Sequence, residues 1–415
     1  MVKQESANMR KSRKLYTFIF TVFVIAVGLF LSEELIRNSA VIEQIENYKE
    51  LEIVHSTSSL AQVVIPSQTA TITQVKDLSG QLVRHLFNID SVPSPKSAIF
   101  SFDGKEIWVT MLLNSKRGVA VFNSQTGEKI KDINLADGGG VEAIFSRDGK
   151  LAYVSQMETA KIFEIDTETK TVLRTFNTDS TWTKVLEFSA DGTTLFASNW
   201  ASNDVSEIDL SSGELIRKIP TVKTPRGIYA TKDGKYLYVA GFDSGEIQKI
   251  DLKTGQGQII YKSGGAMRHI VANEERGVLF VSDMGKNVIL QVLLADDSVQ
   301  KFVSTDMNPN TIVLSPDRKV LFVSCRGKNY SAENYYIPGP EWGSILLFDT
   351  GTGKMLDAII GGNQPTALAI SVDGKTLVFS DFLDYKLEVF EIPSYSVLVE
   401  GNGGRSNVYK AELKK

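Results

Sequence analysis

Four basic side chains recur at one register of a sequence that repeats about every 42 residues between Lys96 and Gly401. This register stands seven residues before an acidic turn residue, and its members are Lys96, Val141, Lys184, Arg226, Arg268, Asn310 and Thr366. Four cations and no acid at equivalent positions would concentrate positive potential on a carboxylate, a phosphate or an acidic segment of a partner protein. The alternative is that nearby acids, namely Glu142, Asp283 and Asp381, neutralise these cations.

A second register, nine residues after each turn acid, carries mostly large apolar or aromatic side chains. Its members are Leu112, Met157, Trp200, Phe242, Met284, Arg326 and Phe382. Aromatic groups exposed on a rigid rim are typical of recognition surfaces, so Trp200 is a candidate contact residue. The alternative is that these side chains pack between neighbouring repeats.

The sixth repeat is longer than the others by about 14 residues, which lie within its upper loop, residues 326–343, called the insertion below. Tyr335, Tyr336 and Trp342 within it are amphipathic side chains suited to ligand or protein contact. Insertions in repeat proteins often lie on the binding face. We therefore expect the insertion, with Arg326 at its start, to join the site. The alternative is a loop that fills the centre of the fold.

These patterns define one candidate site and leave little room for other chemistry. The candidate ligand-binding residues are Lys96, Lys184, Trp200, Arg226, Arg268, Asp283, Arg326, Tyr335, Tyr336, Trp342 and Asp381. Three scattered histidines, a single cysteine and no Cys-x-x-Cys-His sequence predict no metal site, no haem and no other cofactor. A net charge of −4 argues against a nucleic-acid partner.

The elements that must position these residues follow from the spacing of the turns. The turn acids are Asp103, Asp148, Asp191, Asp233, Glu275, Asp317 and Asp373, separated by 45, 43, 42, 42, 42 and 56 residues. Four short strands per repeat at this period predict an all-β, seven-bladed β-propeller of four-stranded antiparallel blades. The Asp-Gly turns then lie on one face. Both registers and the insertion lie on the opposite, upper face.

The repeat resembles that of the YVTN family of bacterial seven-bladed β-propellers. The matching strings are residues 150–155 and 235–240 and the Ile-Asp pairs at 165–166, 208–209 and 250–251. The resemblance covers roughly residues 70 to 401 and implies the fold without assigning a catalytic residue. Similar propellers include sugar-lactone hydrolases, so a second hypothesis places Arg268, His269, Asp283 and Asp381 around a lactone. A third, suggested by some relatives, is DNA binding outside the cytoplasm.

The N-terminal part predicts a membrane anchor and a stalk. Residues 15–31 carry no charge and follow the basic tail 1–14, which favours a transmembrane signal anchor at 15–32 with a cytoplasmic N-terminus. A cleaved signal peptide is the alternative. Residues 33–68 carry an apolar stripe at helical spacing. We expect a stalk helix that packs on the propeller or the lipid surface, or that pairs as a short homodimeric coiled coil.

The remaining segments are a propeller at 69–402 and a C-terminal tail at 403–415. Strand-like residues 71–75 and 82–86 match the third and fourth strands of a blade, so we expect this hairpin to help close the ring. An eighth blade is left open. The sequence as a whole predicts a membrane-anchored propeller, in the periplasm or the extracellular space. Its upper face would bind an anionic ligand or a protein partner.

Overall fold

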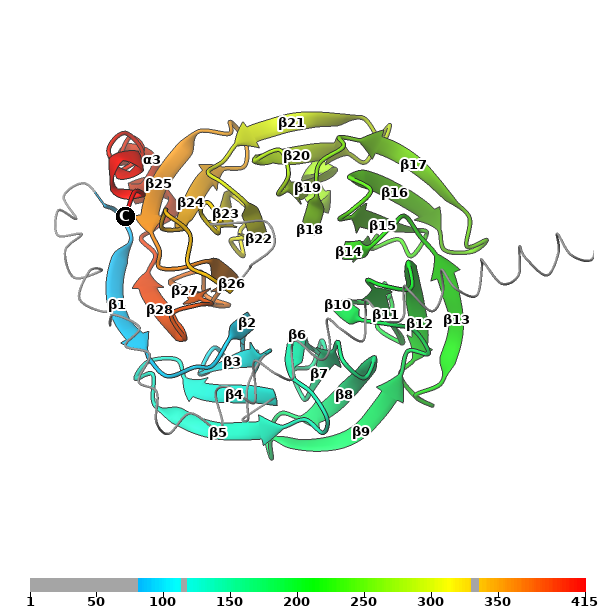
Figure 1. The fold of residues 1–415 in the computed structure, drawn as a ribbon. Helices are drawn as coiled ribbons and strands as arrows, with labels where there is room; N and C mark the ends of the chain where they lie inside the picture. Colours follow the sequence, from blue (N-terminus) through cyan, green and yellow to red (C-terminus); the bar gives the residue numbers. More distant parts are fainter. Residues whose placement is uncertain (1–80, 113–117, 330–335) are drawn as a thin grey trace, which may run out of the picture. The chain divides into compact units, whose positions relative to one another are not determined.

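A computed structural model describes residues 81–112, 118–329 and 336–415. All of them belong to one compact unit, residues 71–415. Within these residues, seven four-stranded antiparallel sheets succeed one another around a ring (Figure 1). The predicted seven-bladed propeller is therefore confirmed.

The predicted anchor and stalk lie outside the described residues, as do the predicted tail at 1–14 and the strand at 71–75. No helix in the part of the chain that the structure describes has the length and apolar character needed to cross a membrane.

Each of the first six sheets is built from four consecutive strands. The first three are β2 (Pro95–Phe100), β3 (Glu106–Met111), β4 (Gly118–Asn123) and β5 (Lys129–Asn134); β6 (Gly140–Phe145), β7 (Leu151–Gln156), β8 (Lys161–Asp166) and β9 (Thr171–Asn177); and β10 (Thr183–Phe188), β11 (Thr194–Asn199), β12 (Asp204–Asp209) and β13 (Leu215–Pro220). The next three are β14 (Pro225–Ala230), β15 (Tyr236–Gly241), β16 (Glu246–Asp251) and β17 (Gly257–Lys262); β18 (Met267–Asn273), β19 (Val278–Asp283), β20 (Val288–Leu293) and β21 (Val299–Ser304); and β22 (Pro309–Leu314), β23 (Val320–Cys325), β24 (Ser344–Asp349) and β25 (Met355–Ile360).

The seventh sheet closes the ring by joining the two ends of the propeller. It has the order β26 (Pro365–Ile370), β27 (Thr376–Asp381), β28 (Lys386–Glu391) and β1 (Arg84–Ile89). The outermost strand β1 comes from the N-terminal side and pairs antiparallel with β28. The fourth strand that we expected at residues 82–86 thus exists as β1, which begins two residues and ends three residues later. The third strand of this sheet is β28, from the C-terminal side, in place of the expected residues 71–75. The described residues form seven sheets and no eighth.

The turn between the first two strands of each sheet explains the repeating acid. In the first sheet Asp103 accepts hydrogen bonds from the Ser101 hydroxyl at 2.7 Å and from the Lys105 backbone N–H at 3.1 Å. Gly104 adopts a φ of +73°, which a side chain would disfavour. The fifth sheet replaces this turn with a 3₁₀ helix, η1 (Glu274–Arg276). These local bonds hold the hairpins in register.

A buried carboxylate ties the strands at both ends of the propeller. Asp357 in β25 accepts hydrogen bonds from the backbone N–H groups of Leu82 at 2.7 Å, Val83 at 3.1 Å and Arg405 at 3.0 Å. Residues 403–415, expected as a tail, pack on the sixth sheet, with Tyr409 of η2 (Tyr409–Glu412) fully buried in its core. The helix α3 (Tyr395–Glu400) contacts β25 as well.

Candidate anion-binding channel

The cationic register falls on the second residue of each innermost strand. In all seven sheets the pairing register with the neighbouring strand shifts at this residue, which marks a β-bulge. A bulge re-aims the extra side chain, and bulges are frequent next to functional sites. The seven bulges therefore direct one side chain each toward the upper end of the central channel.

A hydroxyl group on the second strand holds most of these bulges. The Ser198 hydroxyl accepts a hydrogen bond from the Val185 backbone N–H at 3.0 Å and donates to the backbone carbonyl of Arg226, in the next sheet, at 3.0 Å. Equivalent hydroxyls accept from the innermost strand at Thr110, Ser155, Ser282, Ser324 and Ser380. The fourth sheet has Ala240 instead. This hydroxyl position, seven residues after the turn acid, was a signal that the sequence interpretation missed.

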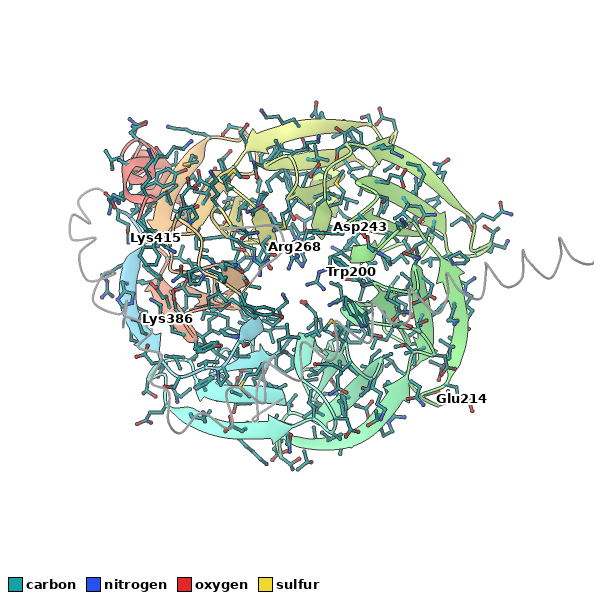
Figure 2. All side chains as sticks on the ribbon, viewed as in Figure 1. Trp200, Glu214, Asp243, Arg268, Lys386 and Lys415 are labelled. Atoms are coloured by element: carbon teal, nitrogen blue, oxygen red, sulfur yellow. The ribbon has the colours of Figure 1, made fainter. Side chains whose placement is uncertain are left out.

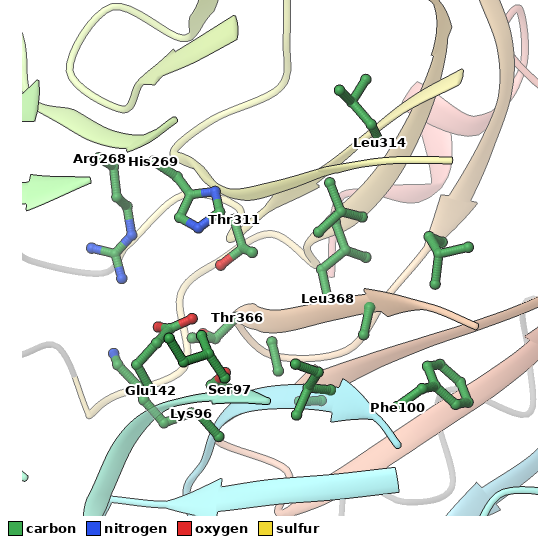
Figure 3. Close-up of a pocket in the computed structure, with 18 of the residues that line it drawn as sticks. Lys96, Ser97, Phe100, Glu142, Arg268, His269, Thr311, Leu314, Thr366 and Leu368 are labelled. Carbon is green, nitrogen blue, oxygen red and sulfur yellow. The ribbon is translucent and has the colours of Figure 1, made fainter. Parts of the chain in front are cut away.

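Five predicted cations converge at the upper end of the channel. Burial lowers the pKa of Lys96 well below its ordinary value, and repulsion from Arg326, Arg268, Arg226 and Lys184 lowers it further. The guanidinium of Arg268 and the ammonium group of Lys96 point into the same space (Figure 3). The sequence therefore placed these five side chains together correctly, although they come from five different sheets.

Two of these cations, Arg226 and Arg268, are poorly compensated within the described part of the chain. Arg226 and Arg268 are 7% and 8% exposed, and neither makes an ion pair with a described residue. The buried Nη1 of Arg226 also lacks a hydrogen-bond partner. Burial lowers the pKa of Arg226, and attraction by Glu142 opposes that change. An isolated buried charge is unstable unless a counter-charge reaches it.

One acid, Glu142, faces these cations among the residues that line the cavity. Burial raises the pKa of Glu142, and attraction by Arg226, Lys96 and Arg268 opposes that rise. Its carboxylate points toward Arg268 in Figure 3. Of the three acids that the alternative hypothesis named as counter-charges, Glu142 is the one that lines the cavity in the part of the chain that the structure describes.

Asp283 and Asp381 lie elsewhere, at the ends of second strands. Asp283 accepts hydrogen bonds from the backbone N–H groups of Ala266 at 3.0 Å and Gly285 at 3.1 Å. Asp381 accepts from Gly362 at 2.7 Å and pairs with Lys386 at 3.3 Å. Both carboxylates thus hold the backbone of upper loops and do not line the cavity.

The cavity between the innermost strands measures about 390 Å³. Lys96 and Arg268 line its upper end together with Thr366, Thr311 and His269 (Figure 3), and Arg226, the bulge residue of the fourth sheet, lines the cavity as well. Burial lowers the pKa of His269 to about 4, so the imidazole is neutral at physiological pH, and its buried Nδ1 lacks a hydrogen-bond partner. Farther along the strands the lining is apolar, with Ala98, Ile99, Phe100, Ile144, Val313, Leu314, Leu368 and Ile370. Ser97 and Thr311 were not among the predicted site residues.

Apolar and aromatic side chains of the second register, nine residues after each turn acid, pack together near this end of the channel. We call the apolar cluster that some of them form with Val141 the rim cluster. Leu112, Val141, Met157 and Phe382 make one apolar cluster, with Trp182, Tyr336 and Leu383 packed against it. The rings of Trp200 and Phe242 are 4.8 Å apart, and the Lys184 ammonium lies 5.5 Å from the Trp200 ring. Trp200 and Arg268 both lie toward the centre of the ring, whereas Glu214 lies on its outer wall (Figure 2). The aromatic side chains therefore pack together and also face a cation.

The described residues of the insertion divide between the rim cluster and the C-terminal segment. Tyr336 packs on the rim cluster, and Arg326 donates a hydrogen bond from Nη2 to the Thr366 hydroxyl at 3.2 Å. Trp342 is only 7% exposed because the C-terminal segment covers it: its backbone N–H donates to the Leu413 carbonyl at 2.7 Å, and the Lys415 ammonium lies 4.3 Å from its ring. Tyr335 lies outside the described residues.

Among the residues that the structure describes, no three His, Cys, Asp or Glu side chains form a group that could hold a metal ion. Cys325 is buried, and burial raises the pKa of its thiol.

Comparison with known proteins supports the fold and narrows the function only slightly. The family model "Lactonase, 7-bladed beta-propeller" matches residues 119–264, about a third of the chain. Antigen Lp49 of Leptospira interrogans is 30% identical over 160 residues, which cover 38% of this chain and 34% of that protein. The match therefore spans about a third of that relative's length.

Solved structures share the architecture at low sequence identity. A chain of hydrazine synthase from Kuenenia stuttgartiensis has a TM-score of 0.62 at 17% identity, with 72% of this chain and 96% of that chain covered. A chain of a mitotic checkpoint complex has a TM-score of 0.61 at 16% identity, covering 75% and 95%. Together with the seven sheets, these comparisons make the chain a seven-bladed β-propeller protein that is similar over residues 119–264 to the lactonase propellers.

Proposed function

We propose that this protein binds a small anionic ligand at the upper end of its propeller channel, through Lys96, Arg226 and Arg268. The observation that carries the proposal is the burial of Arg226 and Arg268 at that end without an ion pair to any described residue. A carboxylate or phosphate that reached the two guanidinium groups would supply the missing counter-charge and hydrogen-bond acceptors. Because the side chains stand on bulges of a closed ring of sheets, little ordering entropy opposes binding.

The burial of these groups favours a small ligand over a flat protein surface. Arg226 and Arg268 are less than one-tenth exposed and lie beside the apolar rim cluster. A partner protein could reach them only with an inserted acidic side chain or terminus. A small anion makes the same contacts without that insertion.

A titration of the full-length chain with small anions tests this proposal. We expect citrate, succinate or inorganic phosphate to bind at low ionic strength, measured by calorimetry, and the joint change Arg226→Ala with Arg268→Ala to abolish binding. The matched control removes two arginines outside the channel, Arg147 and Arg217, and should bind as the parent does. Unchanged affinity in the channel variant would refute the site.

A lactonase-type hydrolase is the second candidate, favoured by the family match and by the position of Glu142. Its carboxylate could take a proton from a water molecule that attacks a lactone carbonyl, while Arg226 and Arg268 stabilise the oxyanion. The raised pKa of Glu142 suits a base that works near neutral pH. The test is a panel of lactones. Hydrolysis by the parent protein that is lost in Glu142→Gln would establish the hydrolase function. Anion binding without turnover would exclude it for that panel.

We further infer from the sequence that the propeller is of the YVTN type and is held outside the cytoplasm by an anchor at residues 15–32. The uncharged run after four basic residues supports the anchor. Protease added to intact cells, or to spheroplasts if the organism has an outer membrane, should digest the propeller. Full protection until the anchor-bearing membrane is lysed would contradict this orientation.

A further inference from the structure

We propose that the ligand is an amphipathic anion, with an acidic head at the cationic end of the channel and an apolar chain along the channel below it. This inference rests on the proposed anion site and names the class of ligand that the rest of the cavity fits.

The lining of the cavity changes character along the strands. At the bulge residues it carries Lys96, Arg226 and Arg268, and one residue later it carries Ser97, Glu142, His269 and Thr311. Three residues after the bulge, the equivalent positions that line the cavity are Ile99, Ile144, Val313 and Ala369. Charge is thus confined to one end, and the wall beyond it is apolar.

The polar end has hydrogen-bonding atoms left for a head group. The buried Nη1 of Arg226 and Nδ1 of His269 both lack partners within the described part of the chain. A guanidinium N–H can donate to a carboxylate or phosphate oxygen, whereas the single N–H of the neutral imidazole is engaged by the Ile312 backbone. The unpartnered Nη1 of Arg226 is therefore the donor left for an acidic head.

The apolar end would be poorly used by a fully hydrophilic anion. Citrate or phosphate held by the arginines would leave water against Ile99, Ile144 and Val313, which is unfavourable. An apolar chain would displace that water. A cavity of about 390 Å³ lies at the small end of ligand pockets, so it fits a short chain and excludes a diacyl lipid.

A series of straight-chain carboxylates, from acetate to decanoate, tests the inference on the full-length chain. Each added methylene should tighten binding about fourfold until the channel is full, after which affinity should level off. Phosphate and octyl phosphate form a second pair that distinguishes the head groups. We expect the alkylated member of each pair to bind more tightly.

The outcomes separate this inference from the proposed function. If acetate and octanoate, and likewise phosphate and octyl phosphate, bind with equal affinity, the amphipathic ligand is refuted while the anion site stands. If none of these anions binds, and citrate and succinate do not either, both proposals fall.

A wall variant keeps the test independent of the cations. Val313→Thr should reduce the gain per methylene for octanoate and leave acetate unchanged, because it places a hydroxyl in the apolar wall. The matched control is Val172→Thr on the outer strand β9, where the side chain is 37% exposed. An undiminished gain in Val313→Thr would count against a chain lying along this wall.

Discussion

Replacing Arg268 with Met should stabilise the ligand-free protein while abolishing anion binding. Arg268 is 8% exposed, and no described residue forms an ion pair with it. Burial lowers its pKa well below the ordinary value, repulsion from Arg226 adds to that effect, and attraction by Glu142 opposes it only in part. The charged form is therefore disfavoured in the folded protein, and a methionine of similar length removes the charge while filling most of the space.

The size of the effect follows from comparable substitutions. Exchanging a whole buried ion pair or triad for apolar residues stabilises proteins by about 1–4 kcal/mol, and we expect a similar gain here because Arg268 has no ion-pair partner among the described residues that its loss would strand. At about 2 °C per kcal/mol for a domain of this size, the melting temperature should rise by roughly 2–8 °C. Thermal and urea unfolding, followed by circular dichroism, would measure it.

The control arginine should behave in the opposite way. Arg217 pairs with Glu207 at 2.6 Å and also donates to the Leu252 carbonyl, so Arg217→Met should lower the free energy of unfolding by about 1 kcal/mol. Citrate should raise the melting temperature of this control and of the parent, but not that of Arg268→Met. A lower stability of Arg268→Met than of the parent would refute the reasoning, because it would show that the guanidinium is already compensated.

Two further predictions concern the same end of the channel. Because burial lowers the pKa values of Lys96 and Lys184, anion affinity should be full below those lowered values and fall as the pH rises through them. Between the lowered values and the ordinary value of 10.5 the unfolded chain binds more protons, so the free energy of unfolding without ligand should increase with pH. Ser198→Ala should lower the free energy of unfolding by about 1–3 kcal/mol and weaken anion binding, because the Val185 N–H loses its acceptor and the Arg226 carbonyl its donor.

Calorimetry and urea unfolding across about pH 7 to 10 would test the predicted pH dependence of anion affinity and stability. This range is suitable because unperturbed lysines stay mostly charged in it. An affinity that does not change over this range would contradict it. Ser211→Ala is the control for the hydroxyl, since that exposed side chain donates to Asp209 at an outer turn. If Ser198→Ala is as stable as this control, the hydroxyl does not hold the bulge.

The sequence by itself was sufficient for the blades and for their register. A turn such as Ser101 to Lys105 is held by contacts between residues two to five apart, so its sequence pattern marks the turn wherever it occurs. Counting from each turn acid therefore located the bulge residue in every innermost strand. That count predicted that Lys96, Arg226 and Arg268 share one end of the channel, as the structure shows.

Only the tertiary structure decided which acid faces those cations and which side chains are covered. Asp283 and Glu142 were both candidate counter-charges, yet Asp283 accepts hydrogen bonds from backbone N–H groups up to 17 residues away, and Glu142 faces Arg268 from another sheet. Trp342 reads as an exposed contact residue until the C-terminal segment covers it. Such outcomes depend on contacts between distant parts of the chain, and the spacing within a repeat carries no information about them.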